Sequence, residues 1–372
     1  MELLSKESEI TSFFGTIPIM AASIRLTKRC NLKCVHCYAD SKYGIKGDYE
    51  LKTDEITSII DQLADLSVNE IFFTGGEPLM RQDLADILRY TSRKGIRVLM
   101  STNGIALTES FLEKVKDVDF KLFQISLDGP KKVHEQIRGP GSFERAISAV
   151  KLASMYLKKN VCVGTVLSNI NAQCIDKTME LAYGAGADTF ALMFLILSGR
   201  ASEKISPSAI QIKSALDNTF ATYRRLSPNI RFAHNTTIPP ALYPPDLVNA
   251  GIHTKCALCS FPYTIGIEAN GDVAPCDGFF GPYNFVAGNI RKQSLKEMWN
   301  CSQQFHIVRE TEPQKLTGVC KLCRYQDFCG GGCRASAYIN MNDITSPDPV
   351  CDRLYQANLF PISSLRDMND SL

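Results

Sequence analysis

Short apolar runs alternate with amphipathic helical patterns between about residue 22 and residue 225. The runs have the length and the β-branched and aromatic content of ordinary strands. After the first run, Ile56, Ile59, Ile60 and Leu63 repeat at helical spacing and predict one apolar helix face. The predicted strands are Ser23–Thr27, Glu70–Thr74, Arg97–Thr102, Leu122–Leu127, Val161–Leu167 and Thr189–Phe194, and further helices are predicted within Leu84–Tyr90, Phe143–Tyr156 and Ile175–Tyr183.

This alternation of strands and helices indicates βα units built around a parallel sheet, and so an α/β fold. Six units are two short of a complete eight-fold barrel. An open sheet of the dinucleotide-binding kind fits the alternation equally well. The pattern alone therefore leaves the strand order open.

The character of the chain changes after residue 235. Residues 238–247 (IPPALYPPDL) are rich in proline, which breaks helices, and they predict a domain boundary. Beyond it, Tyr263–Glu268 and Val273–Pro275 flank an Asn-Gly turn and predict a hairpin. Leu295–Trp299 predicts a short helix. We therefore expect an N-terminal extension (1–21), an α/β domain (22–235) and a smaller C-terminal domain (236–372).

Composition excludes several classes of protein. Lys and Arg (41) nearly balance Asp and Glu (39), which excludes a strongly basic nucleic-acid binder and an acidic disordered chain. The longest apolar run, Phe190–Leu197, is far shorter than the ~20 residues that span a bilayer. The N-terminus carries Glu2, Glu7 and Glu9 and lacks the pattern of a secretory signal. We therefore expect a cytoplasmic protein with no nucleic-acid or membrane partner.

The 14 cysteines are unevenly distributed along the chain. Three lie close together near the start, and, with Cys301 set aside, eight more lie from Cys256 to Cys351. A large chain in a reducing compartment uses such clusters for metal or redox chemistry more often than for disulfides. Cys162, Cys174 and Cys301 match no motif, and we expect them to be buried thiols that pack as small hydrophobic residues.

The first group comprises Cys30, Cys34 and Cys37, directly after the first predicted strand. Three thiolates at these spacings can converge on one small cluster if the loop curls around it. Four cysteines complete a 4Fe–4S cluster, so three leave one iron open to a non-protein ligand. A zinc site completed by His36 and a set of ordinary buried thiols are the alternatives from the triplet alone.

CNLKCVHC at residues 30–37 resembles the CxxxCxxC signature of the radical S-adenosylmethionine (SAM) superfamily. The second predicted strand runs into Gly75-Gly76-Glu77-Pro78, which resembles the GGEP motif of the same family. The resemblance implies a partial (β/α)6 TIM-like barrel with a 4Fe–4S cluster at the carboxyl ends of its strands. It also implies that SAM binds the open iron and is reductively cleaved to methionine and a 5′-deoxyadenosyl radical, which abstracts a hydrogen atom from the substrate.

Residues at the carboxyl ends of successive strands are where barrel sites are built. Gly75 and Gly76 leave their backbone open to close approach by the methionine amino group of SAM, although a tight turn alone also explains two glycines. The resemblance implies that Arg138 or Arg145 pairs with the SAM carboxylate, while turn capping is the alternative for each polar residue. The residues that we expect at the SAM site are Gly75, Gly76, Glu77, Pro78, Thr102, Asn103, Ser126, Asp128, Arg138 and Val166.

The C-terminal cysteines match the spacing pattern of the SPASM extension of radical SAM enzymes. Eight thiols are the number for two fully ligated 4Fe–4S clusters, and structural zinc is the alternative. If Cys256 is not a ligand, the first auxiliary cluster keeps an open iron. The resemblance assigns Cys256, Cys259, Cys276 and Cys333 to that first auxiliary cluster, and Cys320, Cys323, Cys329 and Cys351 to a second.

Asp277 directly follows Cys276. A similar Cys-Asp pair occurs in anaerobic sulfatase-maturing members of the SPASM group, in which the aspartate is the base that deprotonates the substrate. The resemblance implies the same catalytic role for Asp277, because a carboxylate beside a radical site suits proton removal. A turn or cap is the alternative for this residue.

Auxiliary clusters offer the substrate electron a place to go, which suits net oxidation. We therefore expect an oxidoreductase with three 4Fe–4S clusters that oxidises or crosslinks a side chain of a ribosomally made peptide or protein. The alternatives are a tetrapyrrole propionate decarboxylase, an aminoglycoside-like small-molecule dehydrogenase, and an iron–sulfur electron carrier without SAM chemistry.

Two further proteins are expected as partners of this reaction. A flavodoxin- or ferredoxin-type protein would supply electrons. The segment before Cys30 is short, so we expect any recognition of a leader peptide to come from a separate protein.

Overall fold

The computed structural model describes residues 18–41, 49–233, 236–251, 263–281 and 285–366. Within these residues the strands form one sheet in the order β10-β9-β8-β1-β2-β3-β4-β5-β6-β7. Strands β1 to β6 are neighbours in chain order and pair in parallel. Because this order shows no reversal, it is that of a partial barrel and not of a dinucleotide-binding sheet. The bounds are β1 Ala21–Arg25, β2 Glu70–Thr74, β3 Arg97–Thr102, β4 Phe120–Ser126, β5 Val161–Leu167, β6 Thr189–Phe194, β7 Arg231–Phe232, β8 Thr264–Ile267, β9 Asp272–Ala274 and β10 Gly288–Asn289.

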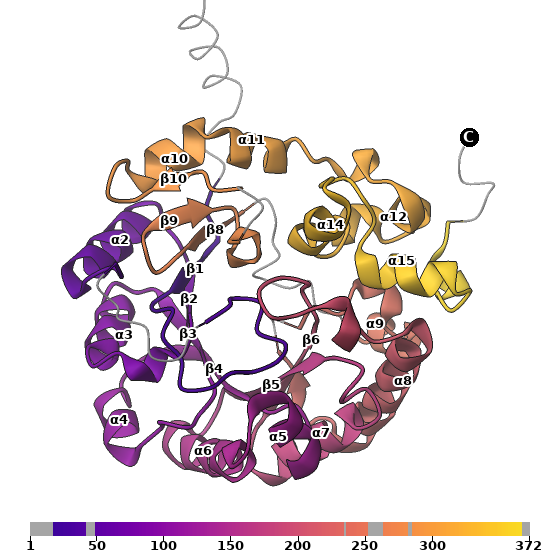
Figure 1. Ribbon diagram of the computed structural model, residues 1–372, viewed down its shortest axis with the longest axis horizontal. Coiled ribbons are helices and arrows are strands. Elements are labelled where there is room, and N and C mark those ends of the chain that lie inside the picture. Colours follow the sequence, from indigo (N-terminus) through magenta and orange to yellow (C-terminus); the bar gives the residue numbers. More distant parts are fainter. Residues whose placement is uncertain (1–17, 42–48, 234–235, 252–262, 282–284, 367–372) are drawn as a thin grey trace, which may run out of the picture.

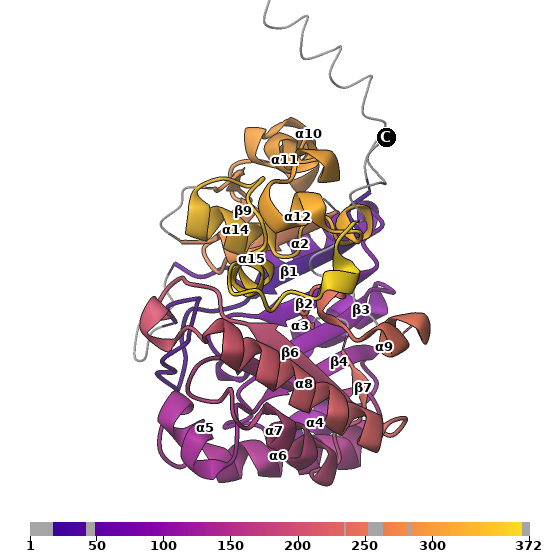
Figure 2. The same ribbon diagram turned by 90° about the vertical axis from the view of Figure 1, so that its right-hand side faces the viewer.

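Helices surround the strands: α10 and α11 lie beside β8 to β10, and α12, α14 and α15 continue round to α8 and α9 on the β6 side (Figures 1 and 2). No helix among the described residues is long and apolar enough to cross a bilayer. The bounds are α2 Thr53–Asp65, α3 Leu84–Arg93, α4 Glu109–Lys114, α5 Lys131–Arg138, α6 Ser142–Leu157, α7 Ile175–Gly184, α8 Ala209–Leu226, α9 Pro245–Asn249, α10 Leu295–Cys301, α11 Gln303–Arg309, α12 Gly318–Leu322, α13 Gln326–Cys329, α14 Arg334–Met341 and α15 Pro349–Gln356.

The central strands are buried on both faces, as a parallel sheet covered by helices requires. One apolar layer joins residues from five successive strands, β2 to β6, and the other side of the sheet packs against the helices in the main core. Cys162 lies in the first layer, and Cys174 is also buried, as predicted. The layer consists of Phe72, Leu99, Leu122, Cys162, Ala191 and Ala233.

The sequence pattern located four of the first six strands to the residue: β2, β3, β5 and β6. The first strand begins and ends two residues earlier than predicted, because the side chain of Thr27 donates to Glu50 Oε1 (2.6 Å) and the backbone there turns into the following loop. Strand β4 likewise begins at Phe120 and ends at Ser126. One prediction was wrong: Cys301 is exposed, because it is the last residue of α10 and its helix turns Leu295, Met298 and Trp299 inward instead.

The C-terminal part of the chain extends the sheet of the α/β part. The predicted hairpin forms as β8 and β9, which pair antiparallel around a turn whose Gly271 has a φ of 89°. Strand β8 also pairs in parallel with β1, in the register Ala21↔Thr264 to Ile24↔Ile267. The hairpin is therefore hydrogen-bonded to the strand that leads into the first cysteine group. A boundary near residue 236 stays a prediction.

The buried apolar layers predict a large stability cost for a core truncation. Phe73 is fully buried in β2, so Phe73→Ala should lower the free energy of unfolding by about 3–5 kcal/mol. Met155→Ala is the control, because Met155 is 74% exposed on α6 and its loss should change stability by less than about 0.5 kcal/mol. Urea unfolding of both variants measures the difference, and equal midpoints would contradict the described packing.

Candidate functional site

The first cysteine group lies in the loop that follows β1, which we call the cysteine loop (residues 26–41). Cys30 and Cys34 are buried, and Cys37 is half-buried. Burial, together with the nearby sulfurs of Cys34 and Cys37, raises the pKa of Cys30 to about 11. Burial also raises the pKa of Cys34. These thiols therefore need a bound metal, or another strong positive charge, to stay ionised near neutral pH.

The GGEP segment after β2 packs directly on the backbone of the cysteine loop. Gly76 N donates to Thr27 O (2.6 Å), and Glu77 N donates to Arg29 O (2.8 Å). A Cβ atom on Gly76 would lie 2.0 Å from Arg29 O, so a side chain at this position would push the two segments apart. The close approach of two backbones is therefore sufficient reason for glycine here. A contact with the SAM amino group stays a prediction.

Glu77 joins the ends of β2 and β3 through its buried carboxylate. It accepts from Thr102 Oγ1 (2.6 Å) and from the backbone nitrogens of Asn103 (2.7 Å) and Leu79 (3.1 Å). Burial raises the pKa of Glu77 in spite of these three donors. Both carboxylate oxygens are engaged inside the protein, so Glu77 and Thr102 hold the shape of the site.

Two side chains from outside the cysteine loop reach its sulfurs. Asn103 Nδ2 lies 3.9 Å from Cys30 Sγ and donates to Asn31 Oδ1 (2.7 Å). Arg138 Nη1 lies 3.8 Å from Cys34 Sγ. Of the two arginines that were candidates for the SAM carboxylate, only Arg138 lies beside the cysteine loop, since Arg145 is exposed on α6. Among the other predicted SAM contacts, Pro78 is buried in the turn after β2, while Ser126 and Val166 are half-buried in β4 and β5.

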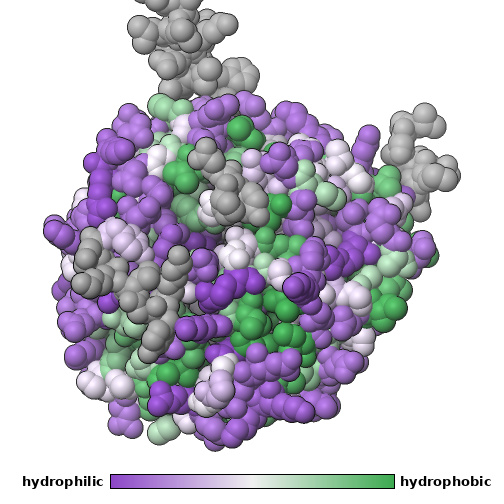
Figure 3. All heavy atoms as spheres, in the orientation of Figure 1, coloured by the Kyte–Doolittle hydropathy of each residue, from purple (hydrophilic) through white to green (hydrophobic). Residues whose placement is uncertain are grey.

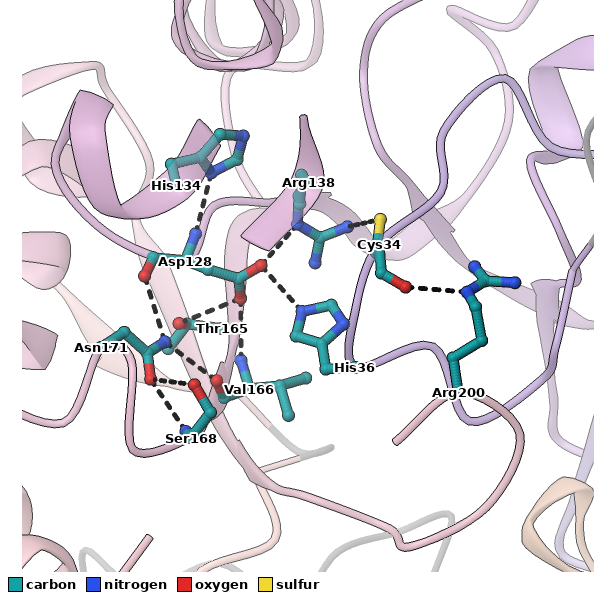
Figure 4. Close-up of polar contacts among 10 residues, drawn as sticks. All are labelled: Cys34, His36, Asp128, His134, Arg138, Thr165, Val166, Ser168, Asn171 and Arg200. Atoms are coloured by element: carbon teal, nitrogen blue, oxygen red, sulfur yellow. Dashed lines mark hydrogen bonds and ion pairs between the residues drawn. The ribbon is translucent and has the colours of Figure 1, made fainter. Parts of the chain in front are cut away.

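Asp128 is fully buried after β4 and connects the cysteine loop to three other segments (Figure 4). Its Oδ2 accepts from His36 Nε2 (2.9 Å) and Arg138 Nε (2.5 Å), and its Oδ1 accepts from Val166 N (3.0 Å). Burial alone would raise the pKa of Asp128, but the charge of Arg138 and the contact with His36 outweigh it and hold the pKa well below its usual range. Asp128 is therefore ionised, and it positions neighbouring groups.

Arg200, which follows β6, is a residue of the site that sequence reasoning missed. Its Nε donates to Cys34 O (2.9 Å), its Nη1 donates to Ser41 O (2.7 Å), and its backbone nitrogen donates to Cys37 O (2.9 Å). These bonds fix the carbonyl groups of the loop from the far side of the barrel. Nothing in the sequence distinguishes Arg200 from other arginines, because its partners, three backbone carbonyls and the carboxylate of Asp40 (3.4 Å), are more than 150 residues away.

The C-terminal hairpin brings Asp277 to the cysteine loop. Tyr38 Oη donates to Asp277 Oδ2 (2.6 Å), and Tyr38 directly follows Cys37. Buried Arg25 donates to Asp277 O (2.7 Å) and forms an ion pair with Glu268 (3.0 Å). Burial and the charge of Asp277 raise the pKa of Tyr38, so its hydroxyl stays protonated and donates. The sequence signal that could have indicated this cluster is Arg25, a lone arginine in a mostly apolar strand.

Four cysteines of the C-terminal part surround one cavity. Cys320, Cys323, Cys329 and Cys351 line it, together with Gly331, Gly332 and Asp348. Burial raises the pKa of Cys320 to about 11 and that of Cys329 to about 12, and raises those of Cys323 and Cys351. Three buried cysteines and the half-buried Cys329 around one cavity fit a metal cluster, because a bound metal would stabilise that many thiolates away from water. These are the residues predicted for the second auxiliary cluster.

The first auxiliary site is only partly described. Cys276 and Cys333 lie close enough that the charge of Cys333, after burial and Asp277, raises the pKa of Cys276. Cys256 and Cys259 lie outside the described residues. Among the residues that are described, no three His, Cys, Asp or Glu side chains converge as ligands of a single metal ion.

His134 predicts a pH dependence of stability. It is buried, and its Nδ1 accepts from Asp128 N (3.1 Å). Burial and the charge of Arg138 lower its pKa from 6.5 to about 4. Between these values the unfolded chain binds a proton that the folded chain does not, so the free energy of unfolding should fall by about 3 kcal/mol as the pH drops from 6.5 to 4.

His134→Asn tests this prediction, because its Oδ1 can still accept from Asp128 N while the side chain no longer titrates. Urea unfolding at several pH values should show a smaller loss of stability in acid for the variant than for the parent chain. Parallel curves would mean that His134 is not the group responsible.

Comparisons with known proteins agree with this geometry. A family model described as the radical SAM superfamily matches residues 24–182, and one described as an iron–sulfur cluster-binding domain, SPASM, matches residues 256–324. An AdoMet-dependent heme synthase of Methanosarcina barkeri is 31% identical, over 88% of this chain and 94% of its own length. The mycofactocin maturase MftC of Mycolicibacterium smegmatis is 32% identical, over 88% of this chain and 81% of its own.

Solved structures share the fold at lower identity. Streptococcus suis SuiB bound to the precursor peptide SuiA has a TM-score of 0.72 at 20% identity, covering 94% of this chain and 80% of that one. The enzyme anSMEcpe with bound AdoMet has a TM-score of 0.73 at 19% identity, covering 91% of this chain and 95% of that one. The partial barrel, the two family matches and the relatives aligned over most of both chains show that this chain belongs to the radical SAM superfamily, in the subgroup that carries a SPASM domain.

Proposed function

We propose that the chain is a radical SAM oxidoreductase with three 4Fe–4S clusters, one in the cysteine loop and two in a C-terminal domain that begins near residue 236. When bound, the cluster of the cysteine loop would cleave SAM reductively and so supply a 5′-deoxyadenosyl radical, which removes a hydrogen atom from the substrate. The observation that carries the proposal is the cavity lined by Cys320, Cys323, Cys329 and Cys351, since a barrel that only cleaves SAM does not need a second group of cysteines.

The chain's own residues prepare the SAM site by fixing the cysteine loop from several sides. Asp128 holds His36 and Arg138, Glu77 holds the β2 and β3 ends, and Arg200 holds the loop carbonyls. Arg138 is the side chain that could donate to a SAM carboxylate, because Asp128 holds its Nε while its Nη1 lies beside Cys34. We expect the nucleoside to contact Ser126 and Val166, which are half-buried on neighbouring strands.

We propose that Asp277 is the base that accepts the proton lost by the substrate. Its backbone follows Cys276, a proposed ligand of the first auxiliary cluster, and its carboxylate meets Tyr38 from the cysteine loop. Asp277 therefore lies between the cysteine loop, where the radical would form, and the first auxiliary cluster, which would take up the electron lost by the substrate. Tyr38 and Arg25 orient it, so that a carboxylate oxygen can accept a proton from the substrate.

A peptide or protein is the substrate class that we favour. The relative MftC is named a maturase, and its similarity covers most of this chain. Hydrophobic residues gather just below the middle of the face seen in Figure 3, with hydrophilic residues on either side, a surface that suits an extended peptide. A tetrapyrrole is the second candidate, because the heme synthase relative aligns over 94% of its own length.

The partners and location follow from this chemistry. Reductive cleavage of SAM requires a low-potential electron, which a flavodoxin- or ferredoxin-type protein would supply. A peptide substrate would involve a separate leader-recognition protein. We place the reaction in the cytoplasm, where buried thiols stay reduced for cluster assembly.

Cys34→Ala should abolish the release of 5′-deoxyadenosine from SAM and dithionite, because one of three ligands of the SAM cluster is lost. Cys301→Ala is the matched control, since Cys301 is exposed and lies in neither thiol group. Chromatography of anaerobic reactions measures the product. Unchanged release from Cys34→Ala, or equal loss in both variants, would contradict the assignment of the first site.

The two substrate classes differ in the mass change of the product. A precursor peptide encoded beside the gene should lose two hydrogens on oxidation, whereas iron coproporphyrin III should lose carbon dioxide and two hydrogens from each propionate that reacts. Mass spectrometry after anaerobic turnover with each probe distinguishes them. Conversion of the porphyrin without conversion of the peptide would replace the favoured substrate class with the second candidate.

A further inference from the structure

Asp348 caps the helix that carries the last cysteine. It is buried, with 4% of its surface exposed, and it directly precedes Pro349, the first residue of α15. Its Oδ1 accepts from Val350 N (3.0 Å) and Cys351 N (3.1 Å). This bond pair fixes the backbone from which the Cys351 side chain extends toward the cavity.

The same residue also contacts cysteines assigned to both auxiliary clusters. Asp348 Oδ2 accepts from Cys333 N (3.0 Å), and Cys333 is assigned to the first cluster. Asp348 N lies 3.4 Å from Cys320 Sγ and donates to it, and Cys320 is assigned to the second cluster. The side chain and the backbone amide of Asp348 therefore contact proposed ligands of both clusters, whose cysteines alternate along the chain.

The packing around Asp348 leaves little freedom for this arrangement. A Cβ atom on Gly332, whose φ is 66°, would lie 2.3 Å from Asp348 Oδ2, so glycine is required there. Arg334, which follows Cys333, donates to Ile344 O (2.7 Å) and Ser346 O (2.6 Å), and also to Gly331 O. The segment before Asp348 is thus held against the glycine turn that separates Cys329 from Cys333.

The charge of Asp348 lies on the wall of the cavity that Cys320, Cys323, Cys329 and Cys351 share. Its carboxylate caps the helix at Cys351 N (3.1 Å) and its amide lies 3.4 Å from Cys320 Sγ, so the charge lies within a few ångströms of two proposed ligands. A negative charge beside a cluster opposes the addition of an electron, and net charge is one of the factors that set cluster potentials.

We propose that Asp348 is a positioning residue shared by the two auxiliary sites: its carboxylate fixes ligand backbones of both, and its charge lowers the reduction potential of the cluster held by Cys320, Cys323, Cys329 and Cys351. This inference rests on the proposed cluster sites.

Asp348→Asn tests the inference in the full chain, because the amide keeps an oxygen to cap α15 but removes the charge and one acceptor. Asp343→Asn is the matched control, since Asp343 is an exposed acid in the same segment and accepts from Thr345 instead of from a cysteine. Both variants and the parent chain are reconstituted anaerobically. Iron and sulfide content, the unfolding temperature and an EPR-monitored redox titration are measured for each.

The expected result for Asp348→Asn is a shift of one auxiliary midpoint to a more positive potential, with both midpoints unchanged in Asp343→Asn. Loss of about four iron atoms from Asp348→Asn at an unchanged unfolding temperature would also support the positioning role. Midpoints and iron content equal to those of the parent chain would overturn the inference. If Asp348→Asn does not fold, Asp348→Ser, which also caps a helix without a charge, decides by the same criteria.

The iron content of the parent chain distinguishes a failure of this inference from a failure of the proposed auxiliary clusters. A parent chain that binds only about four iron atoms would refute the auxiliary clusters themselves. A fully loaded parent chain whose potentials do not respond to Asp348 would refute the role of Asp348 alone.

Discussion

The buried carboxylate of Asp128 is the interaction on which the cysteine loop most depends. It receives hydrogen bonds from the loop through His36, from α5 through Arg138 and from β5 through Val166 N. Because Asp128 is fully buried, removing Arg138 would leave its charge without compensation by a guanidinium, which typically costs about 3–5 kcal/mol. The loop has few internal backbone hydrogen bonds, so its shape comes from segments that reach it across the barrel. Arg138 connects this support to the proposed cluster site, since the guanidinium that pairs with Asp128 also contacts Cys34.

A second constraint acts on the whole chain: its assigned thiols are largely buried, and burial opposes their ionisation. In the cysteine loop and in the C-terminal cavity alike, burial raises the pKa values of the thiols in spite of nearby arginines such as Arg138 and Arg334. Buried cysteines of this kind are stable either as neutral thiols or as thiolates that bind a metal. The pairing of β8 with β1 brings the C-terminal segment to the mouth of the barrel, where Asp277 meets Tyr38. One continuous sheet thus connects the two cysteine-rich parts.

The sequence predicted most of the fold, because alternating strands and helices leave strong local patterns. Four strands were located to the residue, and the grouping of Cys320, Cys323, Cys329 and Cys351 agrees with the single cavity that they line. The contacts that position the site were harder to predict. Arg200 binds backbone carbonyls, Tyr38 binds a carboxylate from a distant hairpin, and Asp348 binds backbone amides. None of these leaves a periodic or motif signal, since each partner is brought close only by the folded chain. The pairing of β8 with β1 was missed for the same reason.

The central claim is that the two thiol groups of the chain hold iron–sulfur clusters, one in the barrel and two beyond it. The iron and acid-labile sulfide content after anaerobic reconstitution tests this most directly. Three clusters predict about twelve iron and about twelve sulfide per chain. A value near four, or stoichiometric zinc in place of iron, would contradict the account.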